Sequence, residues 1–229
     1  MRRLSLLLLV LVAGCGSESP ADLPAPAAPP DSPALTVKPA GESGDQPIVT
    51  SESVPKLDRT HDRIEFQGRS AATCREPVDV AVLSRGARYA VLCGRARVVD
   101  VYDAKTLRRL GRVPAGIGPT QLASDNVDVF YVIDAPGESL LVYHQTPLEL
   151  IRRVHLGGGP YAIAFDRERW GLWITLNGRN QLVNYAAGIR PVLRDTFPSV
   201  QNARRVVVGD DSVWVQGTTD AQVLRLRSK

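Results

Sequence analysis

Short apolar runs separated by turn residues recur along the chain with a period of about 41 residues. Each unit contains three runs rich in β-branched and aromatic residues, and Gly, Asp and Asn separate them. The register is regular, since Pro77, Pro119 and Pro160 are 42 and 41 residues apart. Such runs are typical of β-strands, whereas helical repeats would show a period of about 3.6 residues. The pattern therefore predicts an all-β repeat protein.

Four units of this kind can be aligned, and the first two are followed by a fourth run. The three shared runs lie at 77–82, 89–92 and 98–102, at 119–123, 129–132 and 140–143, at 160–165, 171–174 and 181–185, and at 203–208, 212–215 and 222–226. The additional runs lie at 107–113 and 148–156. Four strands in roughly 41 residues is the size of a β-propeller blade. We therefore expect a β-propeller of about four four-stranded blades.

The last unit shows three runs, and a strand near the N-terminus is a candidate for the fourth. Residues 63–68 (Arg-Ile-Glu-Phe-Gln-Gly) are similar to the fourth-strand stretch at 152–157 (Arg-Arg-Val-His-Leu-Gly). We expect the N-terminal strand Ile64–Phe66 to complete the last blade, because closing a ring removes open sheet edges. An arc that completes itself by self-assembly is the alternative.

Two stretches of the third unit carry a resemblance to known bacterial propellers. Residues 157–166 (Gly-Gly-Gly-Pro-Tyr-Ala-Ile-Ala-Phe-Asp) and 171–185 (Gly-Leu-Trp-Ile-Thr-Leu-Asn-Gly-Arg-Asn-Gln-Leu-Val-Asn-Tyr) resemble blades of the YncE-like, or YVTN-type, propellers. They are also similar to blades of the streptogramin lyases. The resemblance covers about 64–226 and implies the blade without implying an activity. Those families usually have about seven blades, whereas four are expected here.

The N-terminus carries an export signal. Two arginines precede an apolar run at 4–12, and two small residues lead to Cys15. This arrangement predicts a secretory signal peptide, and the run is too short to span about 30 Å of hydrocarbon. Residues 11–15 (Leu-Val-Ala-Gly-Cys) resemble the bacterial lipobox, which implies cleavage of residues 1–14 and a lipid on Cys15. We therefore expect an extracytoplasmic protein that is lipid-anchored to a bacterial membrane, in the periplasm or at the cell surface.

Residues 15–57 have the composition of a disordered spacer, which leaves 58–229 as the propeller domain. Nine prolines and mostly small apolar residues make the stretch 15–57 unable to build a core. It is acidic, although the formal net charge of the whole chain is +4. The domain is therefore basic. Its positive charge favours an anionic partner, or it only reflects scattered, solvated arginines. A nucleic-acid partner is not expected for an exported protein.

The loops between blades, and the turns of the second hairpin of each blade, form the expected ligand face. Polar and aromatic candidates on it are Arg95, Arg97, Gln121, Asp134, Tyr161, Asn177, Arg179, Asn180 and Gln201. Rigid scaffolds often bind ligands through such loops. Tight turns also require Asn, Gly and Asp for their backbone geometry, so a turn role is the alternative for each residue.

The sequence offers little acid–base chemistry. His61 precedes the first unit, and His144 and His155 flank an outermost strand, so none matches the His and Glu pair near the metal of the lyases. The Gly-x-Ser-x-Gly, His-Glu-x-x-His and Cys-x-x-Cys motifs are absent from the sequence. We therefore expect a binding or interaction scaffold without catalytic residues, metal or cofactor. Its partner would be an envelope protein or a small ligand. A divergent streptogramin-lyase-like or other propeller enzyme with metal-assisted chemistry is the alternative.

Cys74 and Cys93 are expected to form a disulfide. Export places the chain in an oxidising compartment, and lipidation of Cys15 leaves an even pair. If the first hairpin turns near Arg85, then Val78 lies opposite Cys93, and Cys74 is just ahead of that strand. The alternative is that both residues are small buried side chains with free thiols.

Overall fold

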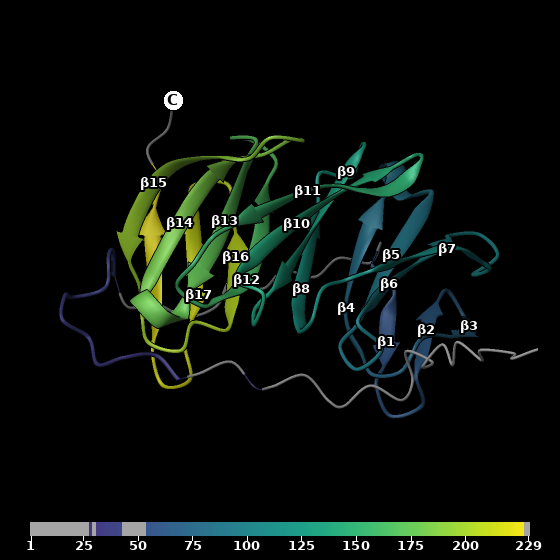
Figure 1. Ribbon diagram of the computed structural model, residues 1–229, viewed down its shortest axis with the longest axis horizontal. Coiled ribbons are helices and arrows are strands. Elements are labelled where there is room, and N and C mark those ends of the chain that lie inside the picture. Colours follow the sequence, from purple (N-terminus) through teal and green to yellow (C-terminus); the bar gives the residue numbers. More distant parts are fainter. Residues whose placement is uncertain (1–27, 29–30, 43–53, 227–229) are drawn as a thin grey trace, which may run out of the picture.

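The computed structural model describes residues 28, 31–42 and 54–226 of the chain (Figure 1). The predicted signal peptide 1–14 and the predicted lipidation site Cys15 lie outside the described residues. Within them, five antiparallel sheets follow one another, and two single 3₁₀ turns accompany the strands. The all-β, propeller-type fold class is confirmed.

We name the sheets in chain order as the first sheet and blades one to four. The first sheet contains β1 (Lys56–Asp58), β2 (Arg63–Phe66) and β3 (Arg69–Ala72). Blade one contains β4 (Pro77–Leu83), β5 (Arg88–Cys93), β6 (Val98–Asp103) and β7 (Arg109–Pro114). Blade two contains β8 (Pro119–Ser124), β9 (Val129–Asp134), β10 (Ser139–Gln145) and β11 (Leu148–His155).

Blade three and blade four complete the order. Blade three contains β12 (Pro160–Asp166), β13 (Gly171–Leu176), β14 (Gln181–Ala186) and β15 (Val192–Pro198). Blade four contains β16 (Arg205–Val208), β17 (Ser212–Gln216) and β18 (Ala221–Arg225). The 3₁₀ turns are η2 (Ser84–Gly86) and η3 (Asn177–Arg179).

The apolar cores lie between neighbouring sheets. Successive residues of a strand point to opposite faces of its sheet, so Val132 and Ile133 of β9 serve two different cores. Val132 packs with Leu92 of β5 between blades one and two, and Ile133 packs with Ile174 of β13 between blades two and three. A strand that is buried on both faces needs a continuous apolar run, and this is the pattern the sequence shows. Each sheet therefore depends on its neighbours for burial.

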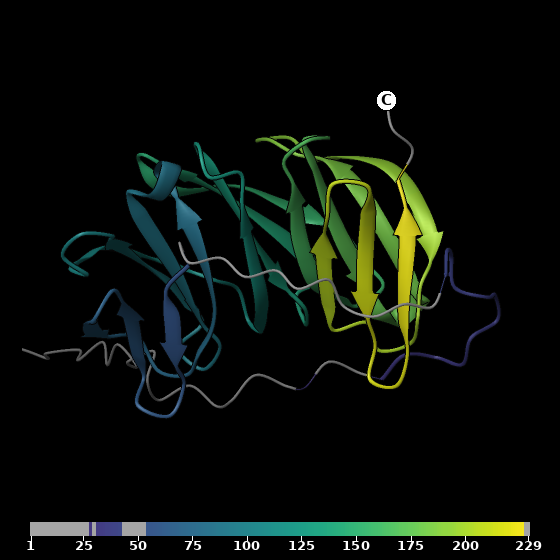
Figure 2. The same ribbon diagram turned by 180° about the vertical axis from the view of Figure 1, so that it is seen from behind.

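The sheets are arranged as an open arc. The first sheet and blade four lie at opposite ends of the array, with the other blades between them in chain order (Figures 1 and 2). Their innermost strands, β1, β4, β8, β12 and β16, pack against one another in the same sequence.

The prediction that Ile64–Phe66 completes the last blade is wrong. These residues belong to β2, the central strand of the first sheet, which pairs with β1 on one side and β3 on the other. Because both edges of β2 are occupied, it has no hydrogen bonds to offer a second sheet. Blade four has three strands among the described residues, and its order is β16-β17-β18.

The first sheet occupies the place of a further blade ahead of blade one. The hydroxyl of Tyr102 donates to the carbonyl of Ala72 in β3, at 3.2 Å. One repeat later, the hydroxyl of Tyr143 donates to the carbonyl of Pro114 in β7. Ala72 and Pro114 are 42 residues apart. The contact of β3 with blade one is therefore equivalent to the contact of β7 with blade two. The described residues thus form five blade-like sheets, whereas about four blades were expected.

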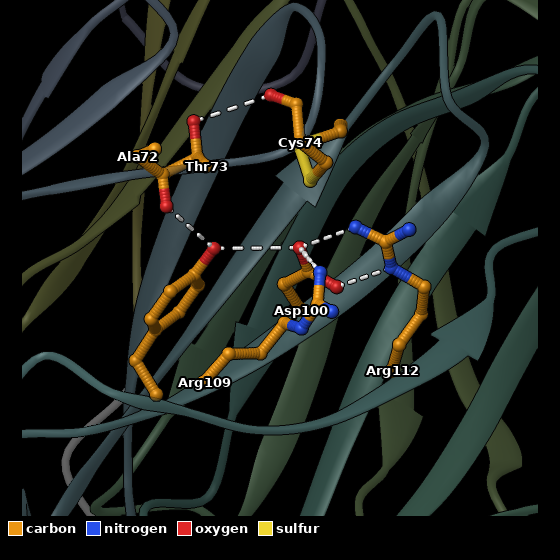
Figure 3. A network of polar contacts seen from close by, with 8 residues as sticks. Ala72, Thr73, Cys74, Asp100, Arg109 and Arg112 are labelled. Atoms are coloured by element: carbon orange, nitrogen blue, oxygen red, sulfur yellow. Dashed lines mark hydrogen bonds and ion pairs between the residues drawn. A yellow bond between two sulfur atoms is a disulfide. The ribbon is translucent and has the colours of Figure 1, made fainter. Parts of the chain in front are cut away.

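A buried carboxylate organises the contact between the first sheet and blade one (Figure 3). Asp100 of β6 is fully buried, and Arg112 donates to its two oxygens at 2.6 and 2.8 Å. Arg109 lies 3.6 Å from the same group. The Tyr102 hydroxyl lies 3.3 Å from Asp100, and burial together with this carboxylate raises the pKa of Tyr102. The tyrosine therefore remains a neutral donor to the first sheet.

The predicted disulfide is confirmed. Cys74 and Cys93 are bonded, and their Cα atoms are 5.9 Å apart. Cys74 follows β3 and Cys93 ends β5, so the bond covalently fixes the first sheet to blade one. Phe66 and Tyr89 pack edge to face beside it, with ring centroids 5.2 Å apart.

Replacing both cysteines, as Cys74→Ala with Cys93→Ala, is expected to lower the free energy of unfolding by about 3 kcal/mol. The reason is that the bond closes a loop of roughly 20 residues in the unfolded chain. Urea unfolding with and without a reductant measures this. The reductant should destabilise the native protein and leave the double variant unchanged. Equal stability of the native protein in both conditions would contradict the assignment.

Candidate functional site

The predicted ligand-face residues do not form one exposed surface. Asp134 is fully buried at the end of β9, where one carboxylate oxygen accepts the N–H groups of Ile117 and Gly118 at 3.0 and 2.9 Å. Arg153 approaches the other oxygen at 3.4 Å. Asn177 is also buried, at 5% exposure. Asp134 therefore fixes the loop that enters blade two and is not placed to contact a ligand.

Several of the other candidates are turn residues. The candidates Arg97 and Asn180 occupy the same position in blades one and three, with a positive φ of 54° and 49°. Glu138, which was not a candidate, is their equivalent in blade two, with a φ of 46°. Each donates its N–H to the residue three positions earlier, as Arg97 does to Gly94. Arg95 lies in the same turn as Arg97, and Arg179 ends η3 in blade three. Turn geometry therefore accounts for these positions.

Gln121 connects three blades. Its side-chain oxygen accepts the N–H of Ile163 in blade three at 3.1 Å, and its amide nitrogen donates to the carbonyl of Arg204 at the start of blade four, at 2.8 Å. Tyr161 is close by, and the guanidinium of Arg204 lies 5.9 Å from the centre of its ring. Both predicted residues lie on the inner side of the arc, where they hold blades together.

Asp79, which was not among the predicted site residues, is the counterpart of Gln121 in blade one. It lies 42 residues earlier, and its carboxylate accepts the N–H of Leu122 in blade two at 2.9 Å. Burial raises the pKa of Asp79 to about 6, although the N–H groups of Leu122 and Val80 and the charges of Arg59 and Arg205 oppose this. The repeat register was the signal that could have identified this residue.

The described part of the N-terminal segment, residues 31–42, covers two of the candidates. We name this segment the strap. The carbonyl of Pro33 accepts hydrogen bonds from the side chains of Asn180 and Gln201, at 2.8 and 2.6 Å. Ser32 exchanges two further bonds with Asn202. The spacer prediction did not include these contacts, which occupy part of the expected ligand face.

The strap then runs along the edge of blade four (Figure 2). Ala40 donates its N–H to the carbonyl of Pro198 at the end of β15. Glu42 forms an antiparallel bridge with Val223 of β18, with bonds of 2.9 and 2.7 Å. The strap therefore fills one end of the gap between β15 and β18, where a fourth strand of blade four would lie.

The other end of this gap is an open cleft of about 660 Å³. Its volume is within the range of small-molecule pockets. The lining residues come from β13, β14, β15 and β18 and from the segments that flank them. They are Arg169, Trp173, Asn184, Arg194, Asp195, Phe197, Leu224, Arg225 and Leu226.

The floor of the cleft is aromatic and rigidly held. The rings of Trp173 and Phe197 are 5.8 Å apart, and Trp173 is only 3% exposed. The indole N–H of Trp173 donates to the buried carboxylate of Asp166 at 3.3 Å. Arg169 approaches the same carboxylate at 3.4 Å and donates to the carbonyl of Asp210 at 2.8 Å. These bonds fix the floor and one wall without a contribution from a ligand.

The rim carries two more arginines. Arg194 donates to the carbonyl of Arg169 at 2.9 Å, and no described acidic side chain lies within ion-pair distance of it. Arg225 pairs with Asp211 at 3.3 Å, and both side chains are largely exposed. Exposed pairs of this kind contribute little stability and are easily exchanged for another partner. The cleft therefore combines an apolar floor with a cationic rim, which is an arrangement for binding.

Neither a metal site nor a membrane span is found in the described ranges. No group of three or more His, Cys, Asp or Glu side chains there has an arrangement that could hold a metal ion. No helix among these residues has the length and apolar character needed to cross a membrane.

Comparison with known proteins identifies the fold. No protein-family profile matches the chain, and no curated protein matches it. Solved structures do match: a chain of the mitotic checkpoint complex superposes with a TM-score of 0.62 at 10% identity, covering 70% of this chain and 54% of that one. These neighbours are β-propeller proteins. The chain has a β-propeller fold.

Two bacterial proteins give the same result. A Lactobacillus plantarum protein superposes with a TM-score of 0.57 at 14% identity, covering 71% of this chain and 54% of its own. A functionally unknown protein from Desulfotomaculum acetoxidans gives 0.55 at 10% identity, with 76% and 75% covered. This propeller chain thus spans about half the length of the first solved structures that it matches. At these identities the comparison shows the fold alone.

Gln121→Met is expected to lower the free energy of unfolding by about 1–2 kcal/mol. Methionine has a similar shape, but it leaves the Ile163 N–H and the Arg204 carbonyl without their partner. Chemical denaturation measures the change. Gln216→Met is the matched control, because Gln216 is exposed and its side chain has no described hydrogen bond. Equal effects of the two substitutions would contradict the role given to Gln121.

Because of Asp79, the free energy of unfolding should fall as the pH rises from about 4 to 6. Its raised pKa means that the folded protein still holds a proton there when the unfolded chain has released one. The contribution of protonated Asp79 to the free energy of unfolding is therefore greatest below pH 4 and is lost as the pH rises through about 6. Relative to Asp79→Asn, which cannot titrate, the native protein should lose about 2 kcal/mol over this range. A pH-independent difference between the two proteins would contradict the account.

Proposed function

We propose that the protein is a lipid-anchored extracytoplasmic scaffold whose propeller arc binds a partner in the bacterial cell envelope. The lipobox-like residues 11–15 and the signal-like run before them support export and anchoring through Cys15. The Cys74–Cys93 disulfide is consistent with an oxidising compartment outside the cytoplasm.

The observation that carries the binding role is the cleft at the edge of blade four that no described strand covers. Its floor and one wall are held by the bonds of Trp173 and Arg169 to Asp166 and by the packing of blade three on blade four, so the site is preorganised. Its described lining contains the acidic group of Asp195 and no His or Cys, and the rest is apolar, amide or arginine. This composition supports recognition without turnover.

The strap supports a tethered arrangement. It lies between Cys15 and the propeller in the sequence, and it is fixed to blades three and four by the bonds to Pro33, Ala40 and Glu42. An anchor at Cys15 would therefore hold this end of the arc by a short connection. The cleft lies beside the strap, so it would keep a defined relation to the anchored end.

Replacing the lipidation site tests the anchoring part of the proposal. Cys15→Ser should move the protein from the membrane pellet to the soluble fraction of fractionated cells, because stable anchoring depends on the buried acyl chains. Mass spectrometry of the native protein should find an acylated N-terminus at Cys15. A native protein that is already soluble, or one that begins at another residue, would contradict anchoring.

Cross-linking in cells tests the scaffold part. A photoreactive amino acid placed at Leu193, an exposed position on β15, should yield a discrete adduct with another protein. The same group at Leu110, an exposed position on β7 of blade one, is the control. Equal adducts at both positions, or none at Leu193, would contradict a scaffold that acts through this end of the arc.

A further inference from the structure

We propose that the cleft binds an extended, acidic segment of a partner protein, which adds as a strand beside β18 and inserts an apolar side chain between Trp173 and Leu224. The inference rests on the proposed scaffold function and gives the chemistry of the partner. Addition of a strand to a sheet edge is a common mode of peptide recognition, in which the backbone gives affinity and side-chain pockets give specificity.

The edge of β18 has unused backbone groups beside the cleft. Leu226 donates its N–H back toward β17, to the carbonyl of Asp211 at 2.7 Å, whereas Val223 directs its N–H and C=O outward to Glu42. Backbone groups alternate between the two sides of a strand, so those of Arg225 also point outward. Nothing in the described chain hydrogen-bonds to them. A partner strand can therefore pair at Arg225.

The strap shows that this edge accepts an added segment. Glu42 pairs with Val223 through two backbone bonds, and Gly41 fits closely against the backbone of Val223 and Leu224. The described part of the strap ends at Glu42, and no described residue pairs with the backbone of β18 at Arg225 on its outer side. A second segment would continue the same sheet without displacing the first.

The floor of the cleft selects an apolar side chain. Trp173 and Phe197 belong to blade three, and Leu224 and Leu226 belong to blade four. A strand beside β18 would direct alternate side chains toward this floor. A bulky apolar residue there would be buried as the cores between the other blades are.

The rim favours acidic residues on either side of the buried apolar residue of the partner segment. Arg194 and Arg225 flank the floor, and the one described carboxylate that pairs with either is the exposed Asp211. Residues two positions away along a strand lie on the same face, so acidic residues on either side of the buried one would reach the rim. Charge complementarity therefore favours an acidic over a basic segment.

A defined peptide tests the inference on the mature protein. The probe is a short, fluorescently labelled peptide with a central Phe, a Glu two positions to either side, and Thr elsewhere. Anisotropy should show saturable binding, and replacing both Glu by Lys should weaken it by about tenfold or more. Backbone N-methylation next to the Phe, which removes donors from the added strand, should weaken it similarly.

Charge reversal locates the site. Arg194→Glu with Arg225→Glu should weaken peptide binding by about tenfold or more, and Arg108→Glu, an exposed arginine of blade one, should leave it unchanged. Equal binding of the Lys peptide, or insensitivity to the double reversal, would overturn the inference. So would full binding of the N-methylated peptide, because the site would then recognise an anion without strand addition.

Two further outcomes separate this inference from the function on which it rests. A concentration-dependent dimer that the double reversal abolishes would overturn the inference, because a second copy would then be the occupant. Failure of the peptide to bind, with a Leu193 adduct still formed in cells, would overturn the inference and leave the scaffold function standing. Failure of both would overturn the scaffold function as well.

Discussion

Apolar packing between neighbouring sheets is the interaction on which the rest of this structure depends. Each core is shared by two sheets, as Leu92 and Val132 are shared by blades one and two. A sheet of this kind is apolar on both faces, so it is stable only between neighbours. Polar contacts such as those of Asp79 and Gln121 then fix how the stacked blades sit against one another.

This dependence explains the two ends of the arc, where a sheet has a neighbour on one side. At the first sheet, the Cys74–Cys93 disulfide and the Tyr102 hydroxyl secure a small sheet that buries little by itself. At blade four, the strap covers part of the gap beside β18. The remainder, which no described residue covers, is the cleft. The candidate site is thus a direct consequence of incomplete packing at one end of the arc.

The sequence predicted the blades because their period is carried by strands that are buried on both faces. It predicted the disulfide because Cys74 lies just ahead of the strand that pairs with β5, although Pro77 and not Val78 lies opposite Cys93. It did not predict the place of Ile64–Phe66, since similarity over a few residues cannot decide which sheet a short strand joins. The shorter hairpin between β2 and β3 also hides the repeat. Turn residues such as Asn180 were ambiguous because tight turns and ligand loops favour the same residues. The cleft was not visible in the sequence, because Arg169, Arg194 and Arg225 meet only through the packing of two blades.

Amide hydrogen exchange along β18 tests most directly that blade four has an unfilled edge beside the strap. In the isolated protein, the amide of Val223 should be protected by its bond to Glu42, and that of Leu224 should be protected by its pairing with β17. The amide of Arg225 should exchange rapidly, because its N–H points toward the cleft and has no hydrogen-bond acceptor among the described residues. Protection of Arg225 equal to that of its two neighbours would contradict the account.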